Sequence, residues 1–157
     1  MTETAMELDN KVIVFQLEDE EYAIPVHSVG SIERVLPITR VPSTAPFVKG
    51  VINLRGVVTP VIDLKHKLKD KETIFDDQTR IIIVNIREVT VGLIVDSAND
   101  VLDIRREDIE PSPETIGQEV KEFIDGVVKM DNRLLILLDL DKILFEEEID
   151  ELQAMEG

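Results

Sequence analysis

The fold is decided by residues 47–64, which read FVKGVINLRGVVTPVIDL. Within this stretch Gly50–Leu54 and Val57–Leu64 are rich in β-branched residues, which suit the pleated surface of a sheet. Arg55 and Gly56 lie between them, where a two-residue turn needs positive φ angles that glycine adopts without steric cost. The stretch therefore predicts a β-hairpin that carries Arg55 at its turn among apolar neighbours.

Further short strands are predicted on both sides of this hairpin, because apolar runs alternate with polar turns. Three more hairpins are expected, at Lys11–Leu17 with Tyr22–Val26, Arg80–Ile86 with Val91–Asp96, and Phe123–Met130 with Arg133–Leu140. In His27–Val35 the apolar residues recur at helical spacing, so we expect one or two helical turns there, weakened by Gly30. Leu140–Met155 is expected to be an acidic amphipathic helix.

The chain also repeats itself. Lys11–Val35 aligns without a gap with Arg80–Ile104 in its apolar alternation, and Phe47–Leu68 aligns in the same way with Phe123–Leu144. Identical pairs in the second alignment include Phe47/Phe123, Gly50/Gly126, Asp63/Asp139 and Leu64/Leu140. We interpret the two alignments as an internal duplication, which favours two similar lobes.

Each copy has roughly five short strands with turns at short intervals, a pattern typical of small closed β-barrels. A lobe of about 60 residues buries only ~60% of its unfolded surface, so we expect the lobes to pack together around a groove. One two-lobed domain is expected over residues 11–145, with subdomains at about 14–70 and 79–140. The first strand is shared between them as an alternative, and residues 146–157 are expected to form an acidic helix or tail.

Composition excludes several classes of partner. Lys and Arg number 17 against 33 Asp and Glu, which gives a net charge of −16. So acidic a chain repels the phosphates of nucleic acids and of anionic lipids. Cysteine and tryptophan are absent, which excludes thiol chemistry and disfavours a base-stacking surface. The apolar runs are shorter than the ~20 residues of a membrane helix, so no membrane insertion is expected.

A search for catalytic or metal-binding patterns predicts neither. His27 and His66 have no histidine or cysteine at metal-ligand spacing. The acidic residues after Asp139 lack the central glycine of a calcium loop, and no Gly-Lys-Ser/Thr phosphate loop occurs. For Arg55 two interpretations stay open: a solvated turn residue, or a cation for a carboxylate of the other lobe or of a partner.

Four motifs follow one another in the order Glu20–Ile24 (EEYAI), Phe47–Gly56 (FVKGVINLRG), Val61–Leu64 (VIDL) and Val91–Asp96 (VGLIVD). Together they resemble the CheW family of bacterial chemotaxis, from about Lys11 to Leu144. The resemblance implies a mainly β fold with two SH3-like five-stranded β-barrel subdomains packed around a groove, short helices and a C-terminal helix. It implies a non-enzymatic scaffold without a cofactor or a metal, which couples chemoreceptor cytoplasmic tips to the regulatory domain of the histidine kinase CheA. Such a protein would be cytoplasmic and recruited to membrane receptor arrays.

The resemblance also implies which residues meet these partners. Carried over by position, the receptor groove falls on Ile13, Val26, Val29, Ile32 and Ala98. The coupling motif falls on Gly50, Asn53, Arg55 and Gly56. Family members often carry an acidic residue two positions after Val29, where this chain has Ser31, with Glu33 further on. How a charge contact is made beside the groove is therefore left open.

Alternative functions remain at this stage. One is a CheV-like adaptor that lacks its receiver domain, and another is an adaptor for a signalling array unrelated to motility. A third is an SH3-like module that binds proline-rich peptides, which would need an aromatic-lined groove. The chain has one tyrosine, five phenylalanines and no tryptophan, which disfavours the third.

Overall fold

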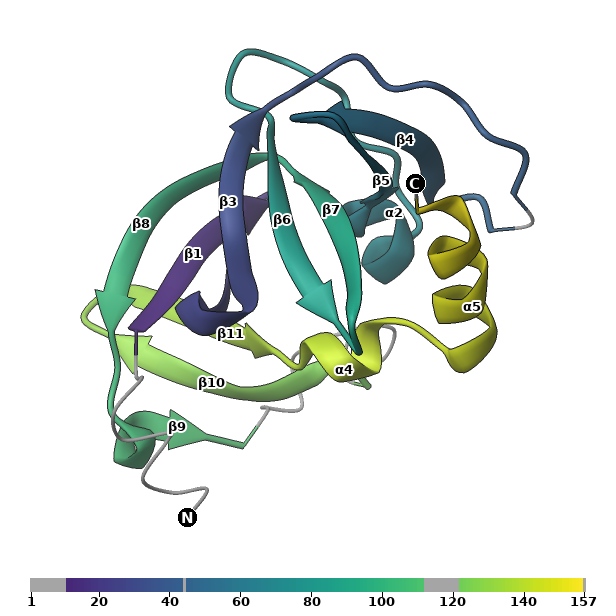
Figure 1. Cartoon of the computed structure of the whole chain (residues 1–157). Coiled ribbons are helices and arrows are strands. Elements are labelled where there is room, and N and C mark those ends of the chain that lie inside the picture. Colours follow the sequence, from purple (N-terminus) through teal and green to yellow (C-terminus); the bar gives the residue numbers. More distant parts are fainter. Residues whose placement is uncertain (1–10, 44, 112–121, 157) are drawn as a thin grey trace.

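The computed structural model describes residues 11–43, 45–111 and 122–156, and this part of the chain is mainly β (Figure 1). In spatial order, the six-stranded sheet contains β8 (Ser97–Asp103), β1 (Lys11–Leu17), β2 (Glu20–Pro25), β11 (Arg133–Leu138), β10 (Ile124–Met130) and β9 (Ile109–Glu110). The five-stranded sheet contains β3 (Val29–Arg34), β6 (Arg80–Ile86), β7 (Val89–Val95), β5 (Val57–Asp63) and β4 (Val48–Leu54). The helical elements are η1 (Val26–Ser28), α2 (Leu64–Lys69), η2 (Arg106–Asp108), α4 (Leu140–Ile143) and α5 (Glu146–Met155).

The repeat predicted from the sequence reappears in the strand pairing. Where β1 pairs with β8, Phe15 lies opposite Ala98, and the equivalent residues Val84 and Val29 lie opposite each other where β6 pairs with β3. The two parallel contacts also match, with Leu137 opposite Ala23 and Val61 opposite Gly92. The prediction of two equivalent lobes with a mainly β fold is therefore confirmed.

The two sheets do not follow the two halves of the chain, however. Hairpin β1–β2, from the first half, lies in the six-stranded sheet, and hairpin β6–β7, from the second half, lies in the five-stranded sheet. The first hairpin of each half therefore pairs with strands of the other half through a parallel contact. These contacts are β2 with β11 and β7 with β5. Parallel neighbours are never joined by a tight turn, so no local sequence signal marks such a pairing. The expected subdomain limits of 14–70 and 79–140 therefore do not coincide with the sheets.

The hydrophobic core has three parts. The largest cluster joins side chains of both sheets, among them Phe15 and Leu17 from one and Val84 and Leu93 from the other. The second cluster contains Val12, Val14, Ala23, Ile104, Val128, Leu135 and Leu137, and the third contains Ile52, Val61, Ile81, Ile83 and Ile94. Apart from Ile104, which follows β8, the residues of each smaller cluster come from one sheet, whereas the largest cluster lies between the two sheets. Neither lobe keeps its apolar surface away from water without the other, as the size argument predicts.

The prediction of one or two helical turns over residues 27–35 is wrong except for the short 3-10 turn η1. After η1 the chain continues as strand β3. The pairing of β3 with β6 skips one position between Val29 and Ser31, so Gly30 is the extra residue of a β-bulge. Such a bulge widens the spacing of residues on one face from two to three. This is why Val29 and Ile32 imitate the spacing of a helix.

The C-terminal helix is present, but it is divided. α4 ends at Ile143 and α5 begins at Glu146, where a single helix from residue 140 was expected. α5 packs against β5 and β7 (Figure 1). Its residues Ile149 and Leu152 are buried in the largest of the three clusters, which we call the central cluster. The acidic helix is therefore an integral part of the hydrophobic core.

Candidate partner-binding surface

The five residues assigned to a receptor groove gather around the edge of the central cluster. Ile13 on β1 belongs to this cluster, and Val26, Val29 and Ala98 pack against it. Ile32 lies opposite Ile82, another member of the cluster, in the pairing of β3 with β6. We call these residues, with Val101, the apolar interlobe face: Ile13, Val26, Val29, Ile32, Ala98 and Val101.

Val101 joins this face because it lies opposite Ile13 on β8. Val101 is 55% exposed and Ile32 is 41% exposed, whereas Ile13 is buried. The self-alignment of the chain places Ile32 over Val101, so the repeat could have identified this residue, which the family resemblance missed. The face thus has a buried floor and two exposed aliphatic residues at equivalent positions of the repeat.

The turn between β4 and β5 holds Arg55 in a left-handed conformation. Arg55 has a φ of 51° and Gly56 a φ of 88°, the signature of the tight hairpin turn that the sequence predicts. Asn53 Oδ1 accepts a hydrogen bond of 2.7 Å from the backbone N–H of Gly56. Asn53 and Gly56 therefore shape the turn, and the Arg55 side chain, 70% exposed, projects from it.

Gly50 has a structural role in the same hairpin. Its φ is 140°, and a β-carbon at this position would lie 2.0 Å from the carbonyl oxygen of Thr39. Thr39 exchanges two backbone hydrogen bonds with Val51, at 2.8 and 2.9 Å, which fasten the β3–β4 connection to β4. At the equivalent Gly126 a β-carbon would lie 2.8 Å from the carbonyl oxygen of Glu110. Both glycines thus leave room for the backbone of a neighbouring segment, which is the β3–β4 connection at Gly50 and β9 at Gly126.

Comparisons with known proteins agree with this architecture. Residues 11–148 match the CheW-like domain. The chain is 47% identical over 137 residues to chemotaxis protein CheW of Bacillus subtilis (strain 168), covering 87% of this chain and 88% of that relative. It is 38% identical over 137 residues to the Klebsiella aerogenes protein of the same name, covering 87% and 82%. The crystal structure of scaffolding protein TtCheW from Thermoanaerobacter tengcongensis superposes with a TM-score of 0.78 at 34% identity, covering 87% and 88%.

The chain belongs to the CheW family.

In this CheW-family chain the Arg55 side chain forms an ion pair with Glu33. Arg55 Nη2 donates to Glu33 Oε2 at 3.0 Å. Glu33 lies on β3 of the same five-stranded sheet, so the partner of Arg55 is not a carboxylate of the other lobe. A hydrogen bond from Ser31 and, secondarily, the Arg55 cation lower the pKa of the Glu33 carboxyl, although partial desolvation opposes them. The pair joins the two outermost strands of this sheet, β3 and β4, at one end.

A second contact network surrounds Lys67 of α2. Its ammonium nitrogen lies 4.7 Å from the ring centre of Phe47, 5.7 Å from Phe123 and 4.5 Å from Phe145. It also donates to Glu148 at 3.0 Å, and Glu148 accepts from the backbone N–H of Phe145 at 2.8 Å. Phe47 and Phe123 are equivalent residues of the repeat, so this cation links the two lobes and the start of α5.

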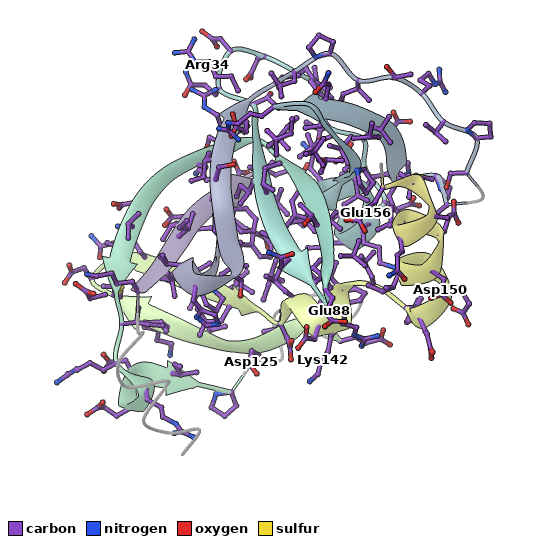
Figure 2. The ribbon with its side chains drawn as sticks, in the orientation of Figure 1. Arg34, Glu88, Asp125, Lys142, Asp150 and Glu156 are labelled. Carbon is purple, nitrogen blue, oxygen red and sulfur yellow. The ribbon has the colours of Figure 1, made fainter. Side chains whose placement is uncertain are left out.

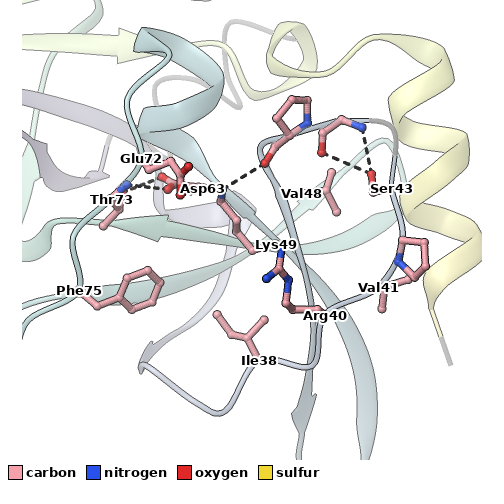
Figure 3. A pocket seen from close by; sticks show the side chains of 13 residues that line it. Ile38, Arg40, Val41, Ser43, Val48, Lys49, Asp63, Glu72, Thr73 and Phe75 are labelled. Carbon is pink, nitrogen blue, oxygen red and sulfur yellow. Dashed lines mark hydrogen bonds and ion pairs between the residues drawn. The ribbon is translucent and has the colours of Figure 1, made fainter.

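A pocket of about 720 Å³ lies between the β3–β4 connection and the loop after α2 (Figure 3). Lys49 there donates to the Pro46 carbonyl oxygen at 3.1 Å, and its nitrogen lies 3.1 Å from His66 Nδ1. The buried Asp63 accepts from both the backbone N–H and the hydroxyl of Thr73 at 2.7 Å. These polar groups bond to one another, so we assign them a role in holding the loops.

No group of three or more His, Asp or Glu side chains that could hold a metal ion occurs among the described residues. Within the same residues, no helix has the length and apolar character needed to cross a membrane.

Proposed function

We propose that this CheW-family chain is a non-catalytic cytoplasmic adaptor that binds the helical tip of chemoreceptors and the regulatory domain of the kinase CheA. The observation that carries the proposal is the apolar interlobe face, where Ile32 and Val101 are exposed at equivalent positions. Exposed aliphatic side chains beside a buried floor suit the apolar side of an amphipathic helix. The membership of the CheW family supports a chemotaxis scaffold as the function of this surface.

Weak contacts suit such an adaptor. Each aliphatic side chain that becomes buried contributes about 1.5–3 kcal/mol before ordering costs are subtracted. A few such contacts give a modest affinity for one receptor tip, and an array with many copies gains through multivalency. An adaptor of this kind shifts the equilibrium of the kinase without locking one state.

The domain that does this work is proposed to be residues 11–145, with α5 docked on it. The Arg55–Glu33 pair is proposed as the coupling element towards CheA, because the Arg55 side chain is exposed and the tight turn fixes its backbone. The peptide-binding alternative is disfavoured by burial, because Phe15 and Tyr22 stack on each other inside the core, fully buried.

The proposal is tested by reconstitution of three purified components: this chain, a soluble receptor-tip fragment and CheA. We expect receptor-dependent activation of CheA autophosphorylation only when this chain is present. Autophosphorylation that is unchanged when the chain is added, or enzymatic activity of the chain alone, would contradict the proposal.

A further inference from the structure

Two arginines lie side by side at the end of the apolar interlobe face. Arg34 ends β3 and Arg80 begins β6, and the two are directly opposite each other in the strand pairing. Directly opposed residues of an antiparallel pair have β-carbons about 5 Å apart, and like charges there are destabilising. Ile32 precedes Arg34 by two positions with no irregularity between them, so both project from the same side of β3.

The other lobe shows what a balanced version of this pair looks like. The equivalent residues of the repeat are Asp103 for Arg34 and Lys11 for Arg80, and they too lie opposite each other. Lys11 and Asp103 form an ion pair at 2.9 Å. One lobe therefore ends its apolar face in a neutralised pair, and the other ends it in two positive charges.

The positive pair is not neutralised by the described residues around it. Arg80 Nη1 donates to the backbone carbonyl oxygens of Asp77 and Thr79, both at 2.9 Å, which fixes its position but does not cancel its charge. The Asp76 carboxylate accepts from Gln78 and Thr79 instead.

Arg34 itself is exposed at the end of β3 (Figure 2). Its side chain makes no ion pair or hydrogen bond with residues 11–43, 45–111 and 122–156. The adjacent Glu33 is paired with Arg55. In a chain of net charge −16, two opposed arginines, one of which has no side-chain partner among the described residues, form an unusual positive site.

We propose that Arg34 and Arg80 bind an acidic side chain of the helix that lies along the apolar interlobe face. This inference rests on the proposed function, because it adds a charged contact to the same docking surface. A guanidinium presents several donors in a plane and suits a carboxylate in two-pronged geometry, and Arg80 is already positioned by its two carbonyl contacts.

The spacing along the strand defines where the acidic residue lies on the partner. Two residues of a strand span about 7 Å, and a helix rises 1.5 Å per residue. The carboxylate is therefore expected about four or five residues beyond the helical side chain that contacts Ile32, on the same side of the helix. A helix with an apolar stripe that ends in Glu or Asp fits the site, and one that ends in Lys or Arg does not.

The test is the affinity of a soluble receptor-tip hairpin for the wild-type chain, for Arg34→Ala and for Arg34→Glu. Lys142→Glu is the matched control, because Lys142 is also an exposed cation and lies at the opposite end of the molecule from Arg34 (Figure 2). At low ionic strength we expect Arg34→Glu to weaken binding about tenfold, Arg34→Ala to weaken it less, and Lys142→Glu to leave it within about twofold. In high salt the difference between wild type and Arg34→Glu should shrink, because screening removes the charge contact.

A reciprocal exchange identifies the partner group. Replacing the acidic residue of the receptor helix with lysine should weaken binding to the wild-type chain and restore binding to Arg34→Glu. Equal affinities of Arg34→Glu and Lys142→Glu for the hairpin would overturn the inference. Failure of the wild-type chain to bind any receptor tip would instead contradict the proposed function.

Discussion

Arg55 combines a strained backbone position with an exposed charge pair. Its left-handed conformation is stabilised by the tight turn, in which Asn53 caps the backbone N–H of Gly56. Its guanidinium contacts Glu33 on β3, the strand at the other edge of the sheet. The hairpin, the turn and the prominence of Arg55 are predictable from local sequence. The partner of Arg55 is not predictable in this way. Glu33 is distant along the chain, and the curvature of the folded sheet brings it next to Arg55.

Arg55→Ala is expected to change the free energy of unfolding by less than about 1 kcal/mol, because exposed ion pairs contribute little. Activation of CheA by receptor fragments should nevertheless fall steeply, and Arg55→Lys should restore little of it, since a point charge does not reproduce a planar fork. Thermal unfolding and reconstituted kinase assays measure the two effects. Loss of several kcal/mol would make Arg55 a structural residue, and full activation by the alanine variant would make it a simple turn residue.

The pKa of Glu33 reports the same contact. Because the folded-state pKa is lowered, this group stabilises the fold above its unfolded pKa, and the contribution is lost as pH falls through the folded value. Carboxyl NMR titration should show a lower midpoint for Glu33 in the wild type than in Ser31→Ala or Arg55→Ala. The midpoint should rise in both variants, because each removes one of the two groups that lower this pKa. Unchanged midpoints in both variants would show that these contacts do not form in solution.

At the scale of single elements, β3 and α5 show where sequence patterns mislead. The β3 residues were expected to be helical because a bulge at Gly30 changes a spacing of two into three, and this spacing does not distinguish a bulged strand from a helix. α5 is acidic and amphipathic, which identifies it as a helix but not its docking site. That site depends on Lys67 and on the groups that surround it, which come from distant parts of the chain.

Leu152→Ala should detach α5 from the lobe. Leu152 is fully buried in the central cluster, and truncation of a buried leucine costs about 2–5 kcal/mol. Amide hydrogen exchange should accelerate throughout α5 in this variant. Gln153→Ala is the matched control, because Gln153 is exposed on the same helix, and its exchange should stay at the wild-type rate. Slow exchange of α5 in Leu152→Ala would show that the helix is held mainly by its polar contacts.

The whole molecule is two equivalent lobes that exchange hairpins and share their largest core. The duplication and the barrel-like lobes follow from the sequence because each repeat carries the same alternation and the same glycine. The exchange of hairpins does not follow, because it depends on the parallel contacts of β2 with β11 and β5 with β7. Of the apolar interlobe face, five residues come from the family resemblance and Val101 comes from the repeat.

Exchange of hairpins predicts that the lobes unfold together. Opening either lobe would expose the central cluster and leave a hairpin of the other half without its neighbours. We therefore expect a single calorimetric transition with equal calorimetric and van't Hoff enthalpies. Two resolved transitions would show that the lobes are independently stable.

The central claim is that the apolar interlobe face binds the receptor tip, and substitution of its exposed residues tests this most directly. Val29 packs against the core, so Ile32→Lys and Val101→Lys are the cleaner variants. Val57→Lys is the control, because Val57 is 53% exposed, as Val101 is at 55%, and lies at the β4–β5 turn. Titration with a receptor-tip hairpin should show about tenfold weaker binding or worse for Ile32→Lys and Val101→Lys, because each buries an unpaired charge in an apolar contact, and wild-type binding for Val57→Lys. Wild-type affinity in a folded Ile32→Lys or Val101→Lys variant would contradict the account.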